Sequence, residues 1–181
     1  MPGPLEGYKV LELTSTVSGP FASMMLADQG ADVIKVEPPG IGDLARFMGA
    51  TKSGIGAMFT VLNRNKKCIC LDLKNTDDFE VLQALIKETD VLIENYRPGI
   101  VKKLGIDYDS AAKINPEIIY CSISGYGQSG PYKEKKVYDP LIQATAGTAA
   151  AQSSSNPEFF KTIVFDKVTA LTAAQSITSA L

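Results

Sequence analysis

The sequence predicts an α/β fold, a Rossmann-like, doubly wound domain with a mostly parallel sheet. Short apolar runs alternate along the chain with longer segments that have the apolar spacing of helices. Each short run is almost continuously apolar, which is typical of parallel strands covered by helices on both faces. Right-handed crossovers between such strands give the doubly wound topology, and the order of the strands stays open.

Five strands and six helices follow from these patterns in chain order. The strands are expected at residues 8–13, 32–37, 68–73, 91–95 and 117–124. The helices are expected at residues 21–29, 75–88, 100–104, 110–114, 140–147 and 166–181. Gly30 ends the first helix as a C-cap would, and Asn75 or Thr76 caps the second. Residues 14–20, 41–60, 125–137 and the serine-rich stretch 152–156 are expected to be loops or less regular segments.

The bulk properties indicate one domain over residues 1–181. A net charge of −2 and a pI of about 5.2 argue against a nucleic-acid-binding protein, which usually carries a basic excess. The N-terminal residues MPGP lack the basic and apolar regions of a signal peptide, and no apolar stretch has the length that spans a membrane, so we expect a cytoplasmic protein. Residues 173–181 are apolar and helical without a C-cap, so we expect the sequence to continue in a longer protein.

Histidine is absent and cysteine is scarce, which limits the chemistry. Without histidine there are no histidine bases, histidine triads or histidine metal sites, and we expect no metal. The three cysteines are Cys68, Cys70 and Cys121, and none has the spacing of a redox or zinc pair. Cys68 and Cys70 are expected to point to the same face of a strand as small buried side chains, in a reducing compartment.

A ligand in this fold is expected beyond the carboxyl ends of the strands. The first loop there reads TSTVSGP, which lacks the glycines of a dinucleotide-binding GxGxxG motif, and no P-loop motif occurs. Glu37 ends the second strand, where NAD enzymes keep a ribose-binding acid. A solvated side chain is the simpler interpretation of Glu37, because a strand-ending glutamate is usually solvated.

Basic residues gather on several loops and could together hold the phosphates of an anionic ligand. For each residue alone, a solvated surface position is the simpler interpretation. The group comprises Arg46, Arg64, Lys66, Lys67, Lys102, Lys103, Lys133, Lys135 and Lys136.

Asp166 stands out because it follows a strand-like TIVF run and opens the last helix. Its position alone indicates an N-cap aspartate. A helix N-terminus also favours an ionised carboxylate, which is the form that a carboxylate nucleophile needs.

Several segments together resemble CoA-transferase family III, which includes formyl-CoA transferase, carnitine CoA-transferase and α-methylacyl-CoA racemase. The similarity covers nearly all 181 residues in the right order. It is carried by GYKVLELTSTVSGPFASMMLADQGADVIKVEPPG, LNRNKKCICLDLK, DVLIENYRPG with KLGIDY, NPEIIYCSISGYGQSGPY, YDPLIQATAG and DKVTALTAAQSITSAL. LNRNK, ENYRPG and SGYGQSGPY with YDPLIQA are specific in combination.

The resemblance implies the N-terminal part of the large, CoA-binding domain of a longer two-domain protein that forms an interlocked homodimer. The family's catalytic aspartate falls on Asp166, and Tyr138 could donate a hydrogen bond in the pocket. A position that is often basic in the family is Pro38, which leaves the adenine end of the site open. The family's coenzyme A contacts fall on Thr16, Val17, Ser18, Leu71, Asn95, Lys103 and Lys136. The glycine-rich loop that covers the aspartate in the transferases is missing, so residues 1–181 alone are expected to be inactive.

The resemblance also implies the reaction: transfer of coenzyme A from an acyl-CoA thioester to a carboxylic acid through an aspartyl intermediate. Coenzyme A is a substrate here, and no covalently bound cofactor is expected. A racemase needs two bases, and Tyr138 stands where the racemases have a histidine, so the transferase is favoured over the racemase alternative. A nucleotide-binding Rossmann module without catalysis is the other alternative.

Overall fold

A computed structural model describes residues 2–153 and 155–181; Met1, and Ser154 of the predicted loop 152–156, lie outside the described residues. Five strands form one sheet: β1 (Lys9–Leu13), β2 (Asp32–Glu37), β5 (Lys66–Cys70), β6 (Val91–Glu94) and β7 (Ile119–Ser122). Their order is β5-β2-β1-β6-β7, and every neighbouring pair is parallel. The predicted parallel, doubly wound sheet is therefore confirmed. The order reverses between β1 and β6, which places a ligand crevice beyond the carboxyl ends of these two strands.

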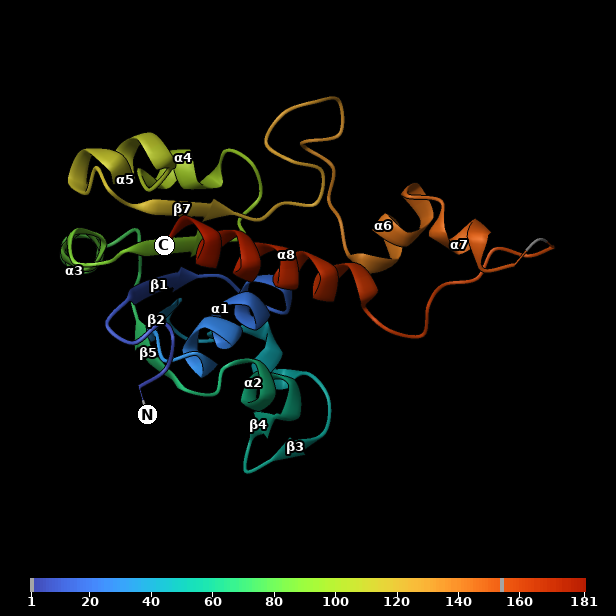
Figure 1. Cartoon of the computed structure of the whole chain (residues 1–181), viewed down its shortest axis with the longest axis horizontal. Coiled ribbons are helices and arrows are strands. Elements are labelled where there is room, and N and C mark those ends of the chain that lie inside the picture. The colour runs from blue at the N-terminus through green and yellow to red at the C-terminus, as the bar shows by residue number, and fades with distance from the viewer. Residues whose placement is uncertain (1, 154) are drawn as a thin grey trace.

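Helices cover both faces of the sheet (Figure 1). One face packs against α1 (Ser18–Asp28) and α8 (Val164–Ala180), and the other against α3 (Thr76–Lys87), α4 (Ile100–Leu104) and α5 (Tyr108–Ile114). The alternation of side chains along a strand explains this arrangement. Val10 of β1 packs with α1 and α8, whereas Leu11 and Leu13 pack toward α3 and α5. All three side chains are almost completely buried.

Shorter elements lie around the carboxyl ends of the strands. Residues 41–62 contain a 3-10 turn, η1 (Leu44–Phe47), a small hairpin of β3 (Thr51–Lys52) and β4 (Ile55–Gly56), and α2 (Ala57–Leu62). The sequence patterns did not predict α2. Two further helices, α6 (Asp139–Thr145) and α7 (Thr148–Ala151), extend away from the sheet (Figure 1).

The third strand differs from the prediction in its bounds and its burial. It was expected at residues 68–73 but runs over Lys66–Cys70 at the edge of the sheet. The predicted burial of Cys68 and Cys70 is wrong, because both are exposed on this edge strand. They do point to the same face, since they pair in register with Lys35 and Glu37.

Two helix starts also differ from the predictions. Helix α1 begins at Ser18, three residues earlier than expected. Helix α8 begins at Val164, so the run TIVF is not a strand and Asp166 lies in the first turn rather than at the N-cap. The capping acceptor is instead the carboxylate of Asp139, whose Oδ1 accepts from the backbone N–H groups of Phe165 (2.6 Å) and Asp166 (3.0 Å).

Four buried charges form a cluster at the carboxyl end of the sheet: Glu12, Lys35, Asp43 and Lys66. The Lys35 ammonium donates to Glu12 (2.8 Å) and to the Thr14 carbonyl (2.8 Å) and lies 2.9 Å from Asp43. Lys66 lies 2.8 Å from the other oxygen of Glu12. None of the Glu12, Lys35, Asp43 or Lys66 side chains has measurable exposure in these ion pairs. Two positive and two negative groups thus balance within one buried cluster.

Lys35 and Lys66 lower the pKa of Glu12, whereas burial raises it. Burial alone raises the pKa of Glu12, but Lys35 and Lys66 outweigh it and lower the pKa to about 2. For Lys66, burial dominates over the attraction of Glu12 and lowers the pKa to about 8. A lowered carboxyl pKa gives stability that is present above the unfolded value and is lost as the pH falls toward 2.

We predict that Lys35→Met lowers the free energy of unfolding by about 3–5 kcal/mol, because it leaves Glu12 and Asp43 with one ammonium between them in the core. Chemical denaturation at neutral pH measures this loss. Lys67→Met is the matched control: Lys67 pairs with Asp32 at 2.7 Å, but both side chains are exposed. We expect a change of about 1 kcal/mol or less for the control. Equal losses in the two variants would contradict a structural role for the cluster.

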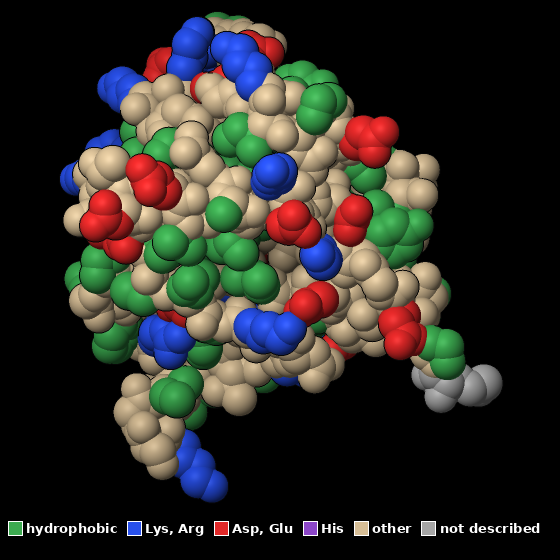
Figure 2. Space-filling view, turned by 90° about the vertical axis from the view of Figure 1, so that its left-hand side faces the viewer, with side chains coloured by type: hydrophobic (Ala, Val, Ile, Leu, Met, Phe, Trp, Pro, Cys, Tyr) green, Lys and Arg blue, Asp and Glu red, His purple; other side chains and the backbone are tan. Residues whose placement is uncertain are grey.

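Charges at the opposite end of the sheet are distributed differently. Figure 2 shows the face toward the amino ends of the strands, where basic, acidic and hydrophobic side chains are interspersed. No broad surface of one sign covers this face, and the concentrated polar interactions lie at the carboxyl end.

Candidate active site

The loop after β1 is held in a strained conformation by side chains from distant segments. Thr16 has a φ of +73°, a left-handed conformation that β-branched residues rarely adopt. Its backbone N–H donates to Asp43 Oδ1 (2.9 Å), and the same oxygen accepts from Ala45 (2.8 Å). Asp43 therefore links the buried charge cluster directly to the strained residue of the loop.

Asn95, just after β6, fixes the same loop from across the crevice. Its Oδ1 accepts from the Ser15 N–H (3.0 Å), and its Nδ2 donates to the Ser15 carbonyl (2.8 Å). Both polar groups of the Ser15 backbone are satisfied by one side chain. Asn95 thus ties the ends of β1 and β6 together at the point where the sheet order reverses.

Helix α1 starts immediately beside this loop, and Gly19 permits the close approach. A Cβ at Gly19 would lie 2.4 Å from the side chain of Thr14. Thr14 in turn donates to Glu12 (2.6 Å), so it has little freedom to move. No side chain of the described residues caps α1.

Asp166 lies at this crevice, partly buried in the first turn of α8. Burial raises its pKa, the neighbouring Asp139 raises it further, and the nearby Ser18 acts in the opposite direction. This rise in pKa is opposite to the lowering that a helix N-terminus alone would cause. Ser18, the first residue of α1, is therefore a close neighbour of this carboxylate.

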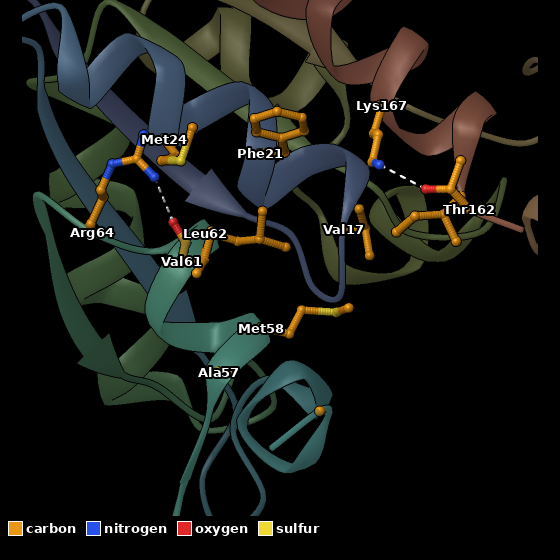
Figure 3. A pocket seen from close by; sticks show the side chains of 12 residues that line it. Val17, Phe21, Met24, Ala57, Met58, Val61, Leu62, Arg64, Thr162 and Lys167 are labelled. Carbon is orange, nitrogen blue, oxygen red and sulfur yellow. Dashed lines mark hydrogen bonds between the residues drawn. The ribbon is translucent and has the colours of Figure 1, made fainter. Parts of the chain in front are cut away.

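An apolar groove of about 580 Å³ lies between α1, α2 and the start of α8 (Figure 3). Ile163, just before α8, and Lys167 of α8 line it, and Asp166 lies between them in the sequence. Val17, next to Ser18, lines it at the same end. The other lining residues are Phe21, Met24, Gly49, Ala57, Met58, Val61, Leu62, Arg64 and Thr162.

A second hollow of about 360 Å³ lies beyond the ends of β2 and β5 and is more polar. Its lining includes Pro38, Arg46 and Glu37. Glu37 is only 5% exposed, and it accepts from Arg46 through both oxygens (2.7 and 2.6 Å). The interpretation of Glu37 as a solvated strand end is therefore wrong.

The structure brings some of the predicted site residues together and leaves others apart. Thr16, Val17, Ser18 and Asn95 converge at the crevice with Asp166. Leu71 is buried after β5, and its N–H donates to the Glu37 carbonyl. Lys103 is exposed on α4, and Lys136 is exposed in the loop before α6. Tyr138 is 74% exposed at the start of α6.

The predicted basic group is less available than its sequence positions indicated. Arg46 pairs with Glu37, Arg64 with Asp28, Lys66 with Glu12 and Lys67 with Asp32. These four side chains neutralise acids of the chain itself. Lys102, Lys103, Lys133, Lys135 and Lys136 are exposed.

Sequence reasoning missed the residues that organise the site, Asp43 and Asp139, together with Lys35. Glu12 and Lys35 carried a usable signal, because a charge in the middle of an otherwise apolar strand must be paired when the strand is central. Asp43 and Asp139 act through backbone N–H groups 27 residues away, and no local pattern marks such contacts.

Comparison with known proteins identifies the family. Residues 5–181 match the sequence model of CoA-transferase family III. The chain belongs to this family. It is 42% identical over 149 residues to the acetyl-CoA:oxalate CoA-transferase of Acetobacter aceti, an alignment that covers 82% of this chain and 38% of that protein. It is 44% identical over 145 residues to the human succinyl-CoA:glutarate CoA-transferase, covering 80% of this chain and 33% of that protein.

A solved structure from the family agrees with the fold. The crystal structure of a CaiB/BaiF family protein from Brucella suis has a TM-score of 0.94 at 38% identity, covering 99% of this chain and 49% of that one. The chain spans about a third of the length of the curated relatives and about half of this solved protein. The position of residues 1–181 within a longer two-domain enzyme stays a prediction.

Two further features concern the described residues alone. None of their helices has both the length and the apolar character needed to cross a membrane. Among residues 2–153 and 155–181, no group of three or more cysteine, aspartate or glutamate side chains is arranged to hold a metal ion.

We predict that Asn95→Ala speeds amide hydrogen exchange at Ser15 by about fivefold or more, because the loss of one hydrogen bond costs about 1 kcal/mol. Exchange followed by NMR or mass spectrometry gives the rate. Asn115→Ala is the matched control, since Asn115 also donates to backbone carbonyls, those of Ile86 and Thr89. Unchanged exchange at Ser15 in Asn95→Ala would contradict the proposed clamp.

Proposed function

We propose that the protein transfers coenzyme A from an acyl-CoA thioester to a carboxylic acid through a covalent intermediate on Asp166. Membership of CoA-transferase family III supports the reaction class. The observation that carries the proposal is the position of Asp166 in the first turn of α8, near Ser18 and the strained loop at the switch point of the sheet. The relatives named above act on oxalate or glutarate, which supports a carboxylic acid as the acceptor.

The chemistry starts with attack of the Asp166 carboxylate on the thioester carbonyl. The C–S bond breaks, the CoA thiolate leaves, and a mixed anhydride forms between Asp166 and the acyl group. The thiolate then attacks the aspartyl carbonyl, which releases the donor acid and gives an aspartyl-CoA thioester. The acceptor carboxylate repeats the two steps in reverse, takes the CoA and regenerates Asp166. Splitting one difficult transfer into several easier steps is the advantage of covalent catalysis.

The environment of Asp166 suits a nucleophile. Partial burial strips water from the carboxylate and raises its pKa, and the charge of Asp139 adds to this effect. A less solvated carboxylate with a higher pKa is a stronger nucleophile toward the thioester carbon. It becomes protonated at a higher pH than an ordinary aspartate, so activity is expected to fall on the acid side as Asp166 gains its proton.

Coenzyme A would bind along the crevice between β1 and β6. The backbone of Thr16, Val17 and Ser18 lies there in a fixed conformation, secured by Asn95. The exposed ammonium groups of Lys103 and Lys136 would reach the phosphates, and Leu71 would contact the nucleotide end. A hydrogen bond from Tyr138 in the pocket, an interlocked homodimer and a cytoplasmic location belong to the same proposal.

We predict that Asp166→Asn lowers kcat for transfer at least a thousandfold in the full-length protein, since the nucleophile is removed. Mass spectrometry after incubation with an acyl-CoA would show a covalent adduct in the wild type and none in the variant. Asp109→Asn is the matched control, because Asp109 is an exposed acid in the first turn of α5. Transfer at close to the wild-type rate by Asp166→Asn would refute the proposal.

The same substitution is expected to stabilise the fold. A carboxyl group whose pKa is higher in the folded than in the unfolded state stabilises the fold at a pH below its unfolded pKa. This stabilisation is lost as the pH rises through the folded-state pKa. At neutral pH the ionised Asp166 therefore costs stability, and Asp166→Asn should raise Tm by a degree or more. A lower Tm in this variant would show that the charge contributes to folding and would contradict the raised pKa.

A further inference from the structure

The segment between β7 and α6 forms a loop whose two ends lie against each other (Figure 1). Residues 125–137 contain no helix or strand. A Cβ at Gly125 would overlap the side chain of Val137, so glycine permits this close approach. A loop whose ends meet and whose own side chains pack together is an Ω-loop, a type that frequently has a functional role.

Two tyrosines and one lysine pack together inside this loop. The rings of Tyr126 and Tyr132 meet edge to face, with centroids 5.6 Å apart and planes at 73°. The Lys135 ammonium lies 3.6 Å from the centroid of the Tyr132 ring. Edge-to-face aromatic pairs and cation–π contacts are both attractive beyond the burial of apolar area. Tyr132 is the central member of this stack, because it contacts both of the others.

Hydrogen bonds connect the loop to the elements on either side of it. The hydroxyl of Tyr126 lies 3.1 Å from the hydroxyl of Thr145 in α6. Toward the sheet, Gln128 donates to the hydroxyl of Ser122 in β7 (2.7 Å), and this hydroxyl donates to Glu94, the last residue of β6. Glu94 is only 1% exposed. The loop is therefore tied to the carboxyl end of β6, which borders the crevice.

Lys136 lies between two residues that this packing holds in place. Its predecessor Lys135 stacks on the ring of Tyr132, and its successor Val137 lies against Gly125. The backbone at Lys136 therefore has little freedom, whereas its side chain is exposed. An ammonium group carried on an ordered backbone loses less conformational entropy when it binds an anion.

We propose that Tyr132 is a positioning residue for coenzyme A: through Lys135 it holds the backbone from which the Lys136 ammonium reaches a phosphate of the ligand. The inference rests on the proposed function and adds a residue to its binding site. Lys135 stays on the tyrosine ring, so Lys136 makes the contact. Three residues later, Asp139 accepts from the backbone N–H of Asp166, which joins the loop to the reacting carboxylate through α6.

The test measures KM for an acyl-CoA and kcat at saturating acceptor in the full-length protein. Tyr132→Leu should raise this KM about fivefold, the effect of one lost aromatic or cation–π contact, and change kcat by less than about twofold. Tyr132→Phe keeps the ring and should keep the wild-type KM. Tyr108→Leu is the matched control and should also keep it, since Tyr108 is an exposed member of an edge-to-face pair on α5, 6.1 Å from Tyr120.

A double variant separates positioning from a general loss of stability. Lys136→Met alone should raise KM about tenfold, because it removes a charge-assisted hydrogen bond to the phosphate. In the Lys136→Met background, Tyr132→Leu should have no further effect on KM, whereas independent effects would multiply. Tyr126→Phe removes only the hydroxyl near Thr145 and should raise KM about twofold while Lys136 is present.

The outcomes separate this inference from the proposed function. An unchanged KM in Tyr132→Leu or in Lys136→Met, or an equal effect of Tyr132→Leu with and without Lys136, would overturn the inference and leave the proposed reaction intact. If Tyr132→Leu does not fold, the same comparison with Tyr126→Phe decides. Absence of transfer from every acyl-CoA in the wild type would overturn the proposed function and this inference together.

Discussion

The balance of four buried charges is the constraint on which the rest of the molecule depends. Glu12, Lys35, Asp43 and Lys66 come from β1, β2, the turn before η1 and β5, segments that are up to 54 residues apart. Each would be costly to bury alone, so all four must be in place together. Each ammonium lies within 2.9 Å of three oxygen atoms, which for Lys66 include those of Pro20 and Asn63. The cluster thereby specifies how the strands align at their carboxyl ends.

This alignment is transmitted to the active site through Asp43. One of its oxygens lies against Lys35 inside the cluster, and the other accepts from Thr16 and Ala45. The left-handed conformation of Thr16 costs free energy and persists only where its surroundings enforce it. The cluster and Asn95 supply this enforcement from opposite sides of the loop. A preorganised backbone lowers the ordering cost of binding a long, flexible ligand, as the proposed coenzyme A site requires.

The periodicity of apolar residues was enough to predict the sheet and its covering helices, because burial on one or two faces determines the order of apolar residues along the chain. It failed where a residue's role depends on distant partners. Cys68 and Cys70 look buried in sequence, but β5 lies at an edge and exposes them. The sequence position of Asp166 indicates an N-cap, but the carboxylate of Asp139 accepts the backbone N–H groups at the start of α8. The groove requires α1, α2 and α8 to meet, and none of them predicts this alone.

The two aspartates at the start of α8 explain why Asp166 does not benefit from its helix. Asp139 is buried and accepts the N–H groups of Phe165 and of Asp166 itself, so the positive end of the helix dipole acts mainly on Asp139. Asp166 is left with partial burial, a like charge nearby and the neighbouring Ser18. Its ionised form is therefore less stabilised than that of a capping aspartate. A capping aspartate would be a stable anion with low reactivity, whereas a second acid in the cap position leaves Asp166 suited to the attack proposed for it.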